Sequence, residues 1–352
     1  MWIKYVRLYI LAATIYPYVQ DLGLAMNRNT LSARDSAILA EIELADTISP
    51  SVIARRLKVR THTVQHSLAR MRSSGVFSRG PFIDIHRLGM RWCGIFMSIS
   101  GDGAQISHAT RFITQQPRVG WFAELHGSFS IGLALAVSSP KQADSFLKEL
   151  ARECGITIYK KSIAFRLSLM DCPRQYLSRR MSRREFYYIE DGVESVSIDS
   201  TDVRILQAFT TFPDSSIREL ASRVGMPHTT VDLRLRKLKA NRVLLGHSIH
   251  IYPEKLGRQL HKLLVYTRAK SEQASRKMRT FAVTHPLVSH FIENIGGWDF
   301  EFNVEIESLA QLQEFENQLR RESAPLINDV VSLGISKVHS LRRFAGDVES
   351  TR

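Results

Sequence analysis

The sequence predicts an α+β protein in which a helix-turn-helix unit, followed by a βαββαβ unit, occurs twice. One observation behind this prediction is an internal repeat. The segment Asp35-Ser36-Ala37-Ile38-Leu39 returns as Asp202-Val203-Arg204-Ile205-Leu206, a shift of 202 − 35 = 167 residues. The other is periodicity, because apolar residues follow helical spacing in the first half of each copy and form strand-length runs in the second half. A duplicated two-part module explains both observations.

The repeat keeps its register along most of the chain. Two single-residue insertions lengthen the shift from 167 to 168 and then to 169 residues. Chance does not produce so long a register, so each copy is interpreted as a pair of domains. The three shifts pair Leu68 with Leu235, Gly89 with Gly257, and Gly127 with Gly296.

The composition is that of a globular protein with a basic excess. Of 352 residues, 44% are hydrophobic, and the formal net charge is +14. Such an excess steers a protein toward polyanions such as nucleic acid, although a basic protein without a polyanionic partner is the alternative. The cysteines lie far apart and are interpreted as core residues in a reducing, cytoplasmic compartment. They are Cys93, Cys154 and Cys172.

Residues 1–29 are interpreted as an N-terminal extension, with Met26 as an alternative start. The apolar run from Leu8 to Tyr16 imitates a signal peptide weakly and is too short to span a bilayer. No membrane partner is therefore expected.

Residues 30–88 and 198–256 are each predicted to form three helices with a tight turn before the third. In the first copy, Ser32 is the expected N-cap of the first helix, the second helix covers about residues 51–57, and Thr61 caps the third. In the second copy, Asp199 caps the first helix and residues 217–224 form the second. The inner faces of the third helices carry Val64, Leu68 and Met71, and Val231, Leu235 and Leu238.

Three helices with a basic outer face on the third predict a DNA-binding helix-turn-helix, because an exposed helix fits the major groove. A protein-binding module with a solvated basic face is the alternative. The candidate base readers are His62, Gln65 and His66 in the first copy and Thr229, Thr230 and Asp232 in the second. The candidate phosphate contacts are Arg56, Arg60, Arg70, Arg72, Arg223, Arg234, Arg236 and Lys237, with Thr61 and His228 at the starts of the third helices.

Residues 89–167 and 257–340 are predicted to be ferredoxin-like βαββαβ sandwiches. Each has an antiparallel sheet with two helices on one face, and the second copy is the expected cover for the other face. The expected strands are 92–99, 117–125, 131–137 and 156–165, then 260–267, 288–294, 299–306 and 327–333. The expected helices are 102–116 and 141–152, then 272–284 and 309–322.

The segment 168–197 is interpreted as a solvated basic linker that includes Arg174, with extra phosphate contact as the alternative. Its residues 186–189 are expected to add a strand beside the second helix-turn-helix. The tail, 341–352, is expected to be loosely held.

An Asp-x-x-Ile-Leu start, a Val-x-x-x-Leu third helix and a Leu-Gly hinge before a βαββαβ domain resemble the leucine-responsive (Lrp/AsnC) family of regulators. The resemblance covers Leu31 to Leu333, twice over. It implies sheet-to-sheet dimerisation of the βαββαβ (RAM) domains, further assembly into a homo-oligomer, and binding of an effector such as an amino acid. Because the two third helices differ, the expected double-stranded DNA target is an imperfect palindrome.

The resemblance also implies where the effector binds. The family pattern beside the turn between strands two and three is Gly-x-aromatic-Asp. The second copy has Gly296-Gly297-Trp298-Asp299, whereas the first has Gly127-Ser128-Phe129-Ser130. Backbone N–H groups there could hold a carboxylate, and Asp299 could pair with an ammonium group. A purely structural strand turn is the alternative. The candidate effector residues are Gly127, Ser130, Gly296, Gly297 and Asp299.

No catalytic motif such as H-E-x-x-H, a Walker loop or G-x-S-x-G occurs, so an enzyme, a cofactor and a metal are not predicted. His247 and His250 lack further metal ligands nearby. Siroheme decarboxylases resemble the chain in architecture and are the enzymatic alternative to a transcription regulator. Their Tyr-Asn-x-Trp-Phe strand is absent where this chain has Asp299-Phe300-Glu301-Phe302. The third hypothesis for the function is a DNA-architectural protein that does not respond to an effector.

Overall fold

The computed structural model describes residues 31–43, 49–178 and 187–341. The predicted N-terminal extension with Met26, residue 186 and the tail beyond residue 341 lie outside the described residues. Within the described part of the chain, no helix is long and apolar enough to cross a membrane.

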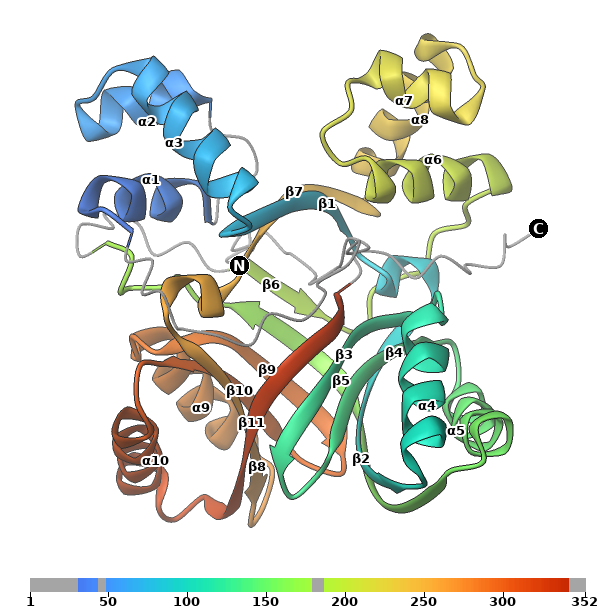
Figure 1. Cartoon of the computed structure of the whole chain (residues 1–352), viewed down its shortest axis with the longest axis vertical. Coiled ribbons are helices and arrows are strands. Elements are labelled where there is room, and N and C mark those ends of the chain that lie inside the picture. The colour runs from blue at the N-terminus through green and yellow to red at the C-terminus, as the bar shows by residue number, and fades with distance from the viewer. Residues whose placement is uncertain (1–30, 44–48, 179–186, 342–352) are drawn as a thin grey trace.

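Two three-helix heads lie on one side of the molecule (Figure 1). The first head contains α1 (Ala33–Glu43), α2 (Pro50–Leu57) and α3 (Thr61–Ser73). The second contains α6 (Ser200–Thr211), α7 (Ile217–Val224) and α8 (His228–Ala240). Asp199 and Ser216 cap α6 and α7 through capping boxes, as residues of these types do at helix starts. The two helical triplets are confirmed.

The turn before the third helix requires a left-handed backbone in both heads. Gly225 adopts φ +68 in the second head, which costs glycine nothing. The first head has Lys58 at this position with φ 55 and ψ 43. This left-handed backbone conformation is unfavourable for any residue that has a Cβ atom.

The strand that follows the third helix of each head, here called its wing, packs on the other head. Strand β1 (Phe77–Ile83) pairs antiparallel with β7 (Leu244–Ile251) to form a separate two-stranded sheet. The strand of each copy packs on the first helix of the other copy, β1 on α6 and β7 on α1. Ile251 consequently belongs to the apolar core of the first head, and Ile83 to that of the second.

The two βαββαβ units follow the predicted order. The first has β2 (Arg91–Ser100), α4 (Gly103–Gln115), β3 (Val119–Gly127), β4 (Ile131–Val137), α5 (Pro140–Cys154) and β5 (Thr157–Asp171). The second has β8 (Gln259–Thr267), α9 (Glu272–Thr284), β9 (Val288–Gly296), β10 (Phe300–Ile306), α10 (Leu309–Ser323) and β11 (Ile327–Leu341). Short 3₁₀ helices, η1 (His86–Leu88) and η2 (Pro253–Leu256), lead from each wing into its unit. The α+β fold class is confirmed.

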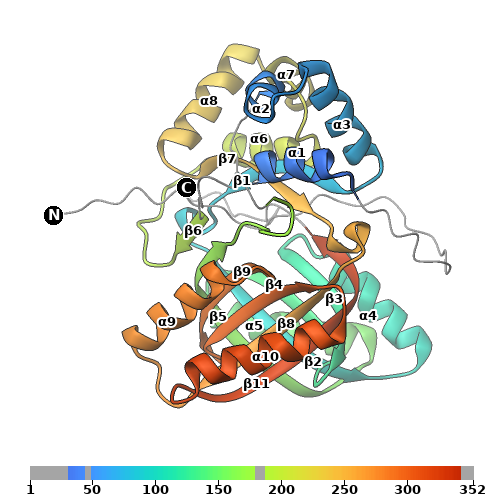
Figure 2. The same cartoon turned by 90° about the vertical axis from the view of Figure 1, so that its left-hand side faces the viewer.

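The two sheets close into one antiparallel barrel. The strand order is β2-β4-β3-β11-β8-β10-β9-β5, and β5 pairs again with β2. The copies meet through β3–β11 and β5–β9. Helices α4 and α5 lie outside one half, and α9 and α10 lie outside the other (Figures 1 and 2). The prediction that one copy covers the open sheet face of the other is confirmed, and that face becomes the barrel interior.

The prediction of a solvated linker at 168–197 is wrong for residues 168–178 and 187–190, whereas residues 191–197 form no helix or strand and are exposed or half-buried. Strand β5 continues to Asp171, and residues 187–190 form β6, which pairs with β5 rather than with the second head. Arg174 is buried instead of facing solvent. A carboxylate from each copy holds it, and neither is near it in sequence.

We predict that Lys58→Gly raises the free energy of unfolding by about 0.5–1 kcal/mol, because glycine adopts the left-handed conformation without strain. Denaturant unfolding of the full chain measures this change. The matched control is Gly225→Ala, where an added Cβ meets nothing within 4 Å and only backbone strain remains. That control should lower the free energy by about 1 kcal/mol. A destabilised Lys58→Gly variant would contradict the strain argument.

Candidate ligand cavity and DNA-binding heads

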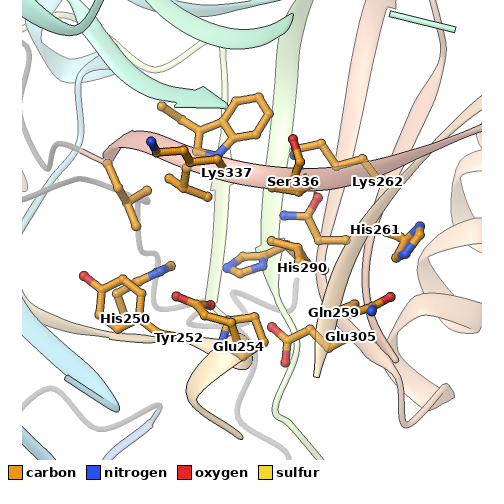
Figure 3. A pocket seen from close by; sticks show the side chains of 18 of the residues that line it. His250, Tyr252, Glu254, Gln259, His261, Lys262, His290, Glu305, Ser336 and Lys337 are labelled. Atoms are coloured by element: carbon orange, nitrogen blue, oxygen red, sulfur yellow. Dashed lines mark hydrogen bonds between the residues drawn. The ribbon is translucent and has the colours of Figure 1, made fainter. Parts of the chain in front are cut away.

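A cavity of about 1420 Å³ lies between the barrel interior and the segment that connects the second wing to β8. Strands of both copies line it, together with His250, Tyr252 and Glu254 from the wing and η2 (Figure 3). Figure 3 shows Lys262 and Lys337 near the strand at the top of the view, His290 in the middle and Glu305 below it.

The two copies contribute unlike walls to the cavity. Lys262 pairs with Asn303 across β8 and β10 just as Gly94 pairs with Ala134 across β2 and β4. The repeat shifts make these positions equivalent, since 262 − 168 = 94 and 303 − 169 = 134. The second copy therefore supplies polar side chains where the first supplies apolar ones. By the same 169-residue shift, Glu301, Glu305 and His290 correspond to Gly132, Ala136 and Trp121.

The first-copy wall is aromatic. Trp92 and Phe96 are buried, and Trp121 is half-buried. Glycines on the neighbouring strands make room for the rings: a Cβ on Gly132 would lie 2.8 Å from Phe96, and one on Gly120 would collide with Trp92. The indole N–H of Trp92 is buried and has no hydrogen-bond partner among the described residues.

The second-copy wall contains a buried lysine. The Lys262 ammonium forms an ion pair with Glu301 and donates a hydrogen bond to Asn303 Oδ1 over 2.9 Å. It also lies 4.5 Å from the centre of the Trp121 ring. Burial lowers the pKa of Lys262, and the adjacent Glu301 carboxylate opposes that shift. Arg166, which is on β5 of the first copy, also lines the cavity, and burial lowers its pKa against the opposing charges of Glu301 and Asp171.

His290 is held neutral in this wall. Burial, followed by the positive charges of Arg174 and its neighbours, places the pKa of His290 well below its ordinary value. Its Nε2 lies 3.3 Å from Asp171 Oδ1, and its Nδ1 lies 3.1 Å from the Ser289 hydroxyl oxygen.

A buried ion network, Glu43–Arg174–Glu305, joins the cavity to the first head. Arg174 Nη1 donates to Glu43 Oε1 at 2.7 Å, and Arg174 Nη2 donates to Glu305 Oε1 at 2.7 Å. The side chains of Glu43 and Glu305 are only 2% and 1% exposed. Tyr176 donates its hydroxyl to Glu305 at 2.5 Å. Burial raises the pKa of Glu43, although Arg174 opposes the shift.

The cavity lining has an excess of positive charge. Six Lys and Arg residues and three Glu residues line it, so the formal balance is 6 − 3 = +3 with the histidines neutral. Arg174 and Arg258 are paired with Glu43 and Glu307 outside the lining, so the positive charge available to an anionic ligand comes mainly from Arg166, Lys255 and Lys337. The basic residues are Arg166, Arg174, Lys255, Arg258, Lys262 and Lys337, and the acidic ones are Glu254, Glu301 and Glu305.

The predicted effector residues have intrachain partners. The Asp299 carboxylate accepts hydrogen bonds from the N–H and hydroxyl of Thr267, each at 2.7 Å. Gly296 adopts φ +127, and a Cβ there would lie 2.7 Å from the carbonyl oxygen of Ile163 on the other copy. Gly297 also packs on β5. These contacts favour the structural reading of the turn.

The first-copy turn is built in the same way. Gly127 adopts φ +120, and an added Cβ would lie 2.9 Å from the carbonyl oxygen of Ser332. Ser130 donates its hydroxyl to the Met97 carbonyl oxygen at 3.4 Å. Of the five predicted effector residues, only Gly127 lines the large cavity.

The candidate base readers lie on the third helices. His62, Gln65 and His66 are exposed on α3. On α8, Thr229 is exposed, whereas Thr230 and Asp232 are half-buried. Helices α3 and α8 lie on opposite sides of the paired heads (Figure 2).

Several predicted phosphate contacts are engaged within the heads. Arg70 pairs with buried Asp35 at 2.5 Å, and Arg234 pairs with Asp202 at 3.1 Å, so both arginines fix the third helix to the first. Arg72 forms an ion pair with Asp214 of the other head. Three others also have partners: Arg56 pairs with Glu41, Arg236 pairs with Asp232, and Arg223 stacks on Phe212. Arg60 and Lys237 are exposed, as are Thr61 and His228 at the helix starts.

The cavity residues were not singled out from the sequence. A signal for them existed in the repeat, because barrel-facing positions such as 94 and 262 differ in polarity between the copies. Among residues 31–43, 49–178 and 187–341, no three His, Cys, Asp or Glu side chains are placed to hold a metal.

Comparison with known proteins identifies the second head. Residues 198–239 match the AsnC-type helix-turn-helix domain. The DNA-binding transcriptional activator DecR of Escherichia coli is 26% identical over 136 residues, covering 38% of this chain and 89% of DecR. The uncharacterised HTH-type regulator YezC of Bacillus subtilis is 25% identical over 142 residues, covering 40% of this chain and 98% of YezC. The fold and this head define a tandem protein of Lrp/AsnC-type architecture.

Solved structures of another protein share the whole tandem arrangement. Siroheme decarboxylase NirDL, in complex with an iron-uroporphyrin III analogue, superposes with a TM-score of 0.57. The match covers 89% of this chain and 94% of NirDL at 15% sequence identity. The two proteins therefore share a fold.

We predict that Arg174→Met lowers the free energy of unfolding by about 3–5 kcal/mol, because two buried carboxylates lose their counter-charge. Denaturant unfolding measures the loss. In the control variant, Glu43→Gln and Glu305→Gln accompany Arg174→Met, so no uncompensated charge remains and most of the stability should return. A loss below about 1 kcal/mol in the single variant would show that the network is not buried in solution.

Proposed function

We propose that the chain binds a carboxylated tetrapyrrole in the barrel cavity and decarboxylates it, as an enzyme of the siroheme decarboxylase type. The observation that carries this proposal is that aromatic residues and several Lys and Arg residues line the same cavity. A tetrapyrrole is a flat π-system with carboxylates at its rim, and it needs both kinds of surface. The fold shared with NirDL, which binds an iron-uroporphyrin III analogue, supports this choice.

Different cavity residues would bind the ring system and the carboxylates of the tetrapyrrole. Trp121, which is half-buried, supplies a face on which the ring system stacks, and the unpartnered indole N–H of Trp92 is a hydrogen-bond donor for a rim carboxylate. Arg166 and Lys337 supply positive charge for further carboxylates. Bound carboxylates thereby lose contact with water, which favours departure of the charged group as neutral CO₂.

Decarboxylation breaks the bond between the carboxyl carbon and the side-chain carbon. The electron pair stays on the side-chain carbon and takes up one proton, so each acetate group becomes a methyl group and one CO₂ leaves. We assign the Lys262 ammonium as the proton donor, since it lies in the cavity over the Trp121 ring. Glu301 and Asn303 keep it in place. Its depressed pKa makes proton release easier than from an exposed lysine.

The strand Asp299-Phe300-Glu301-Phe302 departs from the Tyr-Asn-x-Trp-Phe pattern of siroheme decarboxylases. In this chain, Glu301 on that strand is the partner of Lys262. Binding and decarboxylation are therefore tested as separate properties.

We predict that the chain binds iron-uroporphyrin III with one site per chain, observed as a change in the visible absorption of the tetrapyrrole. Lys262→Met combined with Glu301→Gln removes the assigned proton donor without leaving an unpaired charge, so it should keep binding and slow decarboxylation at least about a hundredfold. Mass spectrometry of the extracted tetrapyrrole then reports decarboxylation.

The control for this experiment is Lys160→Ala, which removes an exposed lysine outside the cavity lining. Its affinity and its rate of decarboxylation should equal those of the unmodified chain. Absence of any absorption change in the unmodified chain would refute the tetrapyrrole site. Binding without mass loss would leave a tetrapyrrole-binding protein that is not a decarboxylase.

The second candidate function is sequence-specific DNA binding by an effector-modulated transcription regulator that forms a homo-oligomer. The observation that favours it is the AsnC-type helix-turn-helix at 198–239, together with the exposed faces of α3 and α8. DecR, a partial relative, is a DNA-binding transcriptional activator. Because the two heads carry different exposed residues, the expected operator is an imperfect palindrome.

We predict that each head reads its own half-site. Arg60→Ala with His66→Ala should weaken one half-site, and Thr229→Ala with Lys237→Ala should weaken the other, each by about 1–3 kcal/mol. Footprints at two salt concentrations on DNA upstream of the protein's own gene measure both. Equal losses at the two half-sites would contradict separate readers, and diffuse coating would indicate architectural binding.

A further inference from the structure

The Glu43–Arg174–Glu305 network connects the cavity to one head only. Glu305 and Arg174 line the cavity, and Glu43 is the last residue of α1 in the first head. The repeat gives the equivalents of the two carboxylates: 43 + 167 = 210 and 305 − 169 = 136. These residues are Thr210 and Ala136, and neither can form an ion pair. The Thr210 hydroxyl instead donates to the Leu206 carbonyl oxygen of its own helix at 2.8 Å.

Apolar contacts alone attach the second head among the contacts described here, whereas the first head has its ion network in addition to apolar contacts with Leu177 and Leu256. Core residues of the second head, such as Leu206, are continuous with Leu88 and Trp92 of the first copy in one apolar cluster. Apolar packing is non-directional and offers no charged group for which an anion could compete. A carboxylate in the cavity can therefore act on the anchor of the first head but has no equivalent target at the second.

The charge of the network makes it sensitive to an anion. Two carboxylates share one guanidinium, so the formal sum is −2 + 1 = −1. A third carboxylate cannot be added at Arg174 without like-charge repulsion and must displace one already there. Glu43 is the more weakly held carboxylate. It takes one guanidinium nitrogen and the Arg174 backbone N–H, whereas Glu305 takes two guanidinium nitrogens and the Tyr176 hydroxyl.

We propose that a ligand carboxylate in the cavity competes with Glu43 for Arg174 and so releases the first head from the barrel while the second head stays anchored. The proposal rests on the anionic-ligand site proposed above and names its regulation. By linkage, a partner that holds the first head against the barrel lowers the affinity for the ligand, and the ligand lowers the affinity for that partner by the same factor.

Hydrogen exchange of the full chain, with and without saturating iron-uroporphyrin III, tests this coupling. The ligand should speed amide exchange in α1 at least about fivefold and leave α6 within about twofold, because only α1 loses an anchor. Visible absorption in the same samples reports whether the ligand is bound. Glu43→Gln should bind the ligand but show no further change in α1 exchange.

Glu41→Gln is the matched control, because Glu41 lies on the same helix and pairs with Arg56 rather than Arg174. It should keep the full α1 response. If Glu43→Gln does not fold, Glu43→Asp keeps the charge but shortens the reach, and should reduce the response. Bound ligand with no α1 change, or with equal changes in α1 and α6, overturns the coupling alone. No bound ligand in the unmodified chain overturns the tetrapyrrole site and the coupling with it.

Discussion

Closure of the barrel by two strand pairs between the copies is the constraint on which the rest of the structure depends. Each βαββαβ sheet has helices on one face, so its other face and its two edges need partners. The pairs β3–β11 and β5–β9 supply the edges, and the facing sheets bury residues such as Phe96, Leu264 and Leu333 between them. The turns at Gly127 and Gly296 pack against strands of the opposite copy because of this closure. The cavity extends from the part of the barrel interior that these side chains leave unfilled to His250, Tyr252 and Glu254 outside the barrel.

Covalent fusion allows this interior to be asymmetric. In a dimer of identical chains, every inward-facing residue occurs twice about the symmetry axis. A symmetric barrel with Lys262 and Glu305 would contain two copies of each, and their buried charges would need twice the compensation. Here Gly94 and Ala136 occupy the equivalent positions, so the first copy is apolar there, although its strand β5 contributes Arg166 to the lining. The asymmetry suits a ligand with a hydrophobic face and an anionic rim.

The local elements were predictable because their signals are local. Helical spacing places α3 and α6 close to their observed bounds, and the repeat shows that the βαββαβ order occurs twice. Asp199 caps α6 as predicted, whereas Thr61 is the first residue of α3 and its N-cap is Arg60, without a side-chain hydrogen bond. The side-chain partners were not predictable, because they lie far apart in sequence. Arg174 was assigned to a solvated basic run, yet Glu43 and Glu305 are each 131 residues away. Arg70 was assigned to phosphate, yet its partner is Asp35, which is 35 residues away.

These internal partners also change what the basic charge means. Arg70, Arg72 and Arg234 form ion pairs with carboxylates of the heads. The net charge of +14 therefore overstates the positive charge that the third helices present to DNA. Helix-turn-helix geometry is thus held by ion pairs and exchanged wings that require no DNA.

The buried network at Arg174 has a different character from these ion pairs. Replacing a buried ion network with apolar residues is often neutral or stabilising. The stability of the fold therefore does not explain why this network is present. The second copy shows that a head can be anchored by apolar contacts, with Thr210 and Ala136 in place of the two carboxylates. A charged anchor in one half of a duplicated fold, placed at the wall of an anion-favouring cavity, is therefore better explained by communication between ligand and head than by folding.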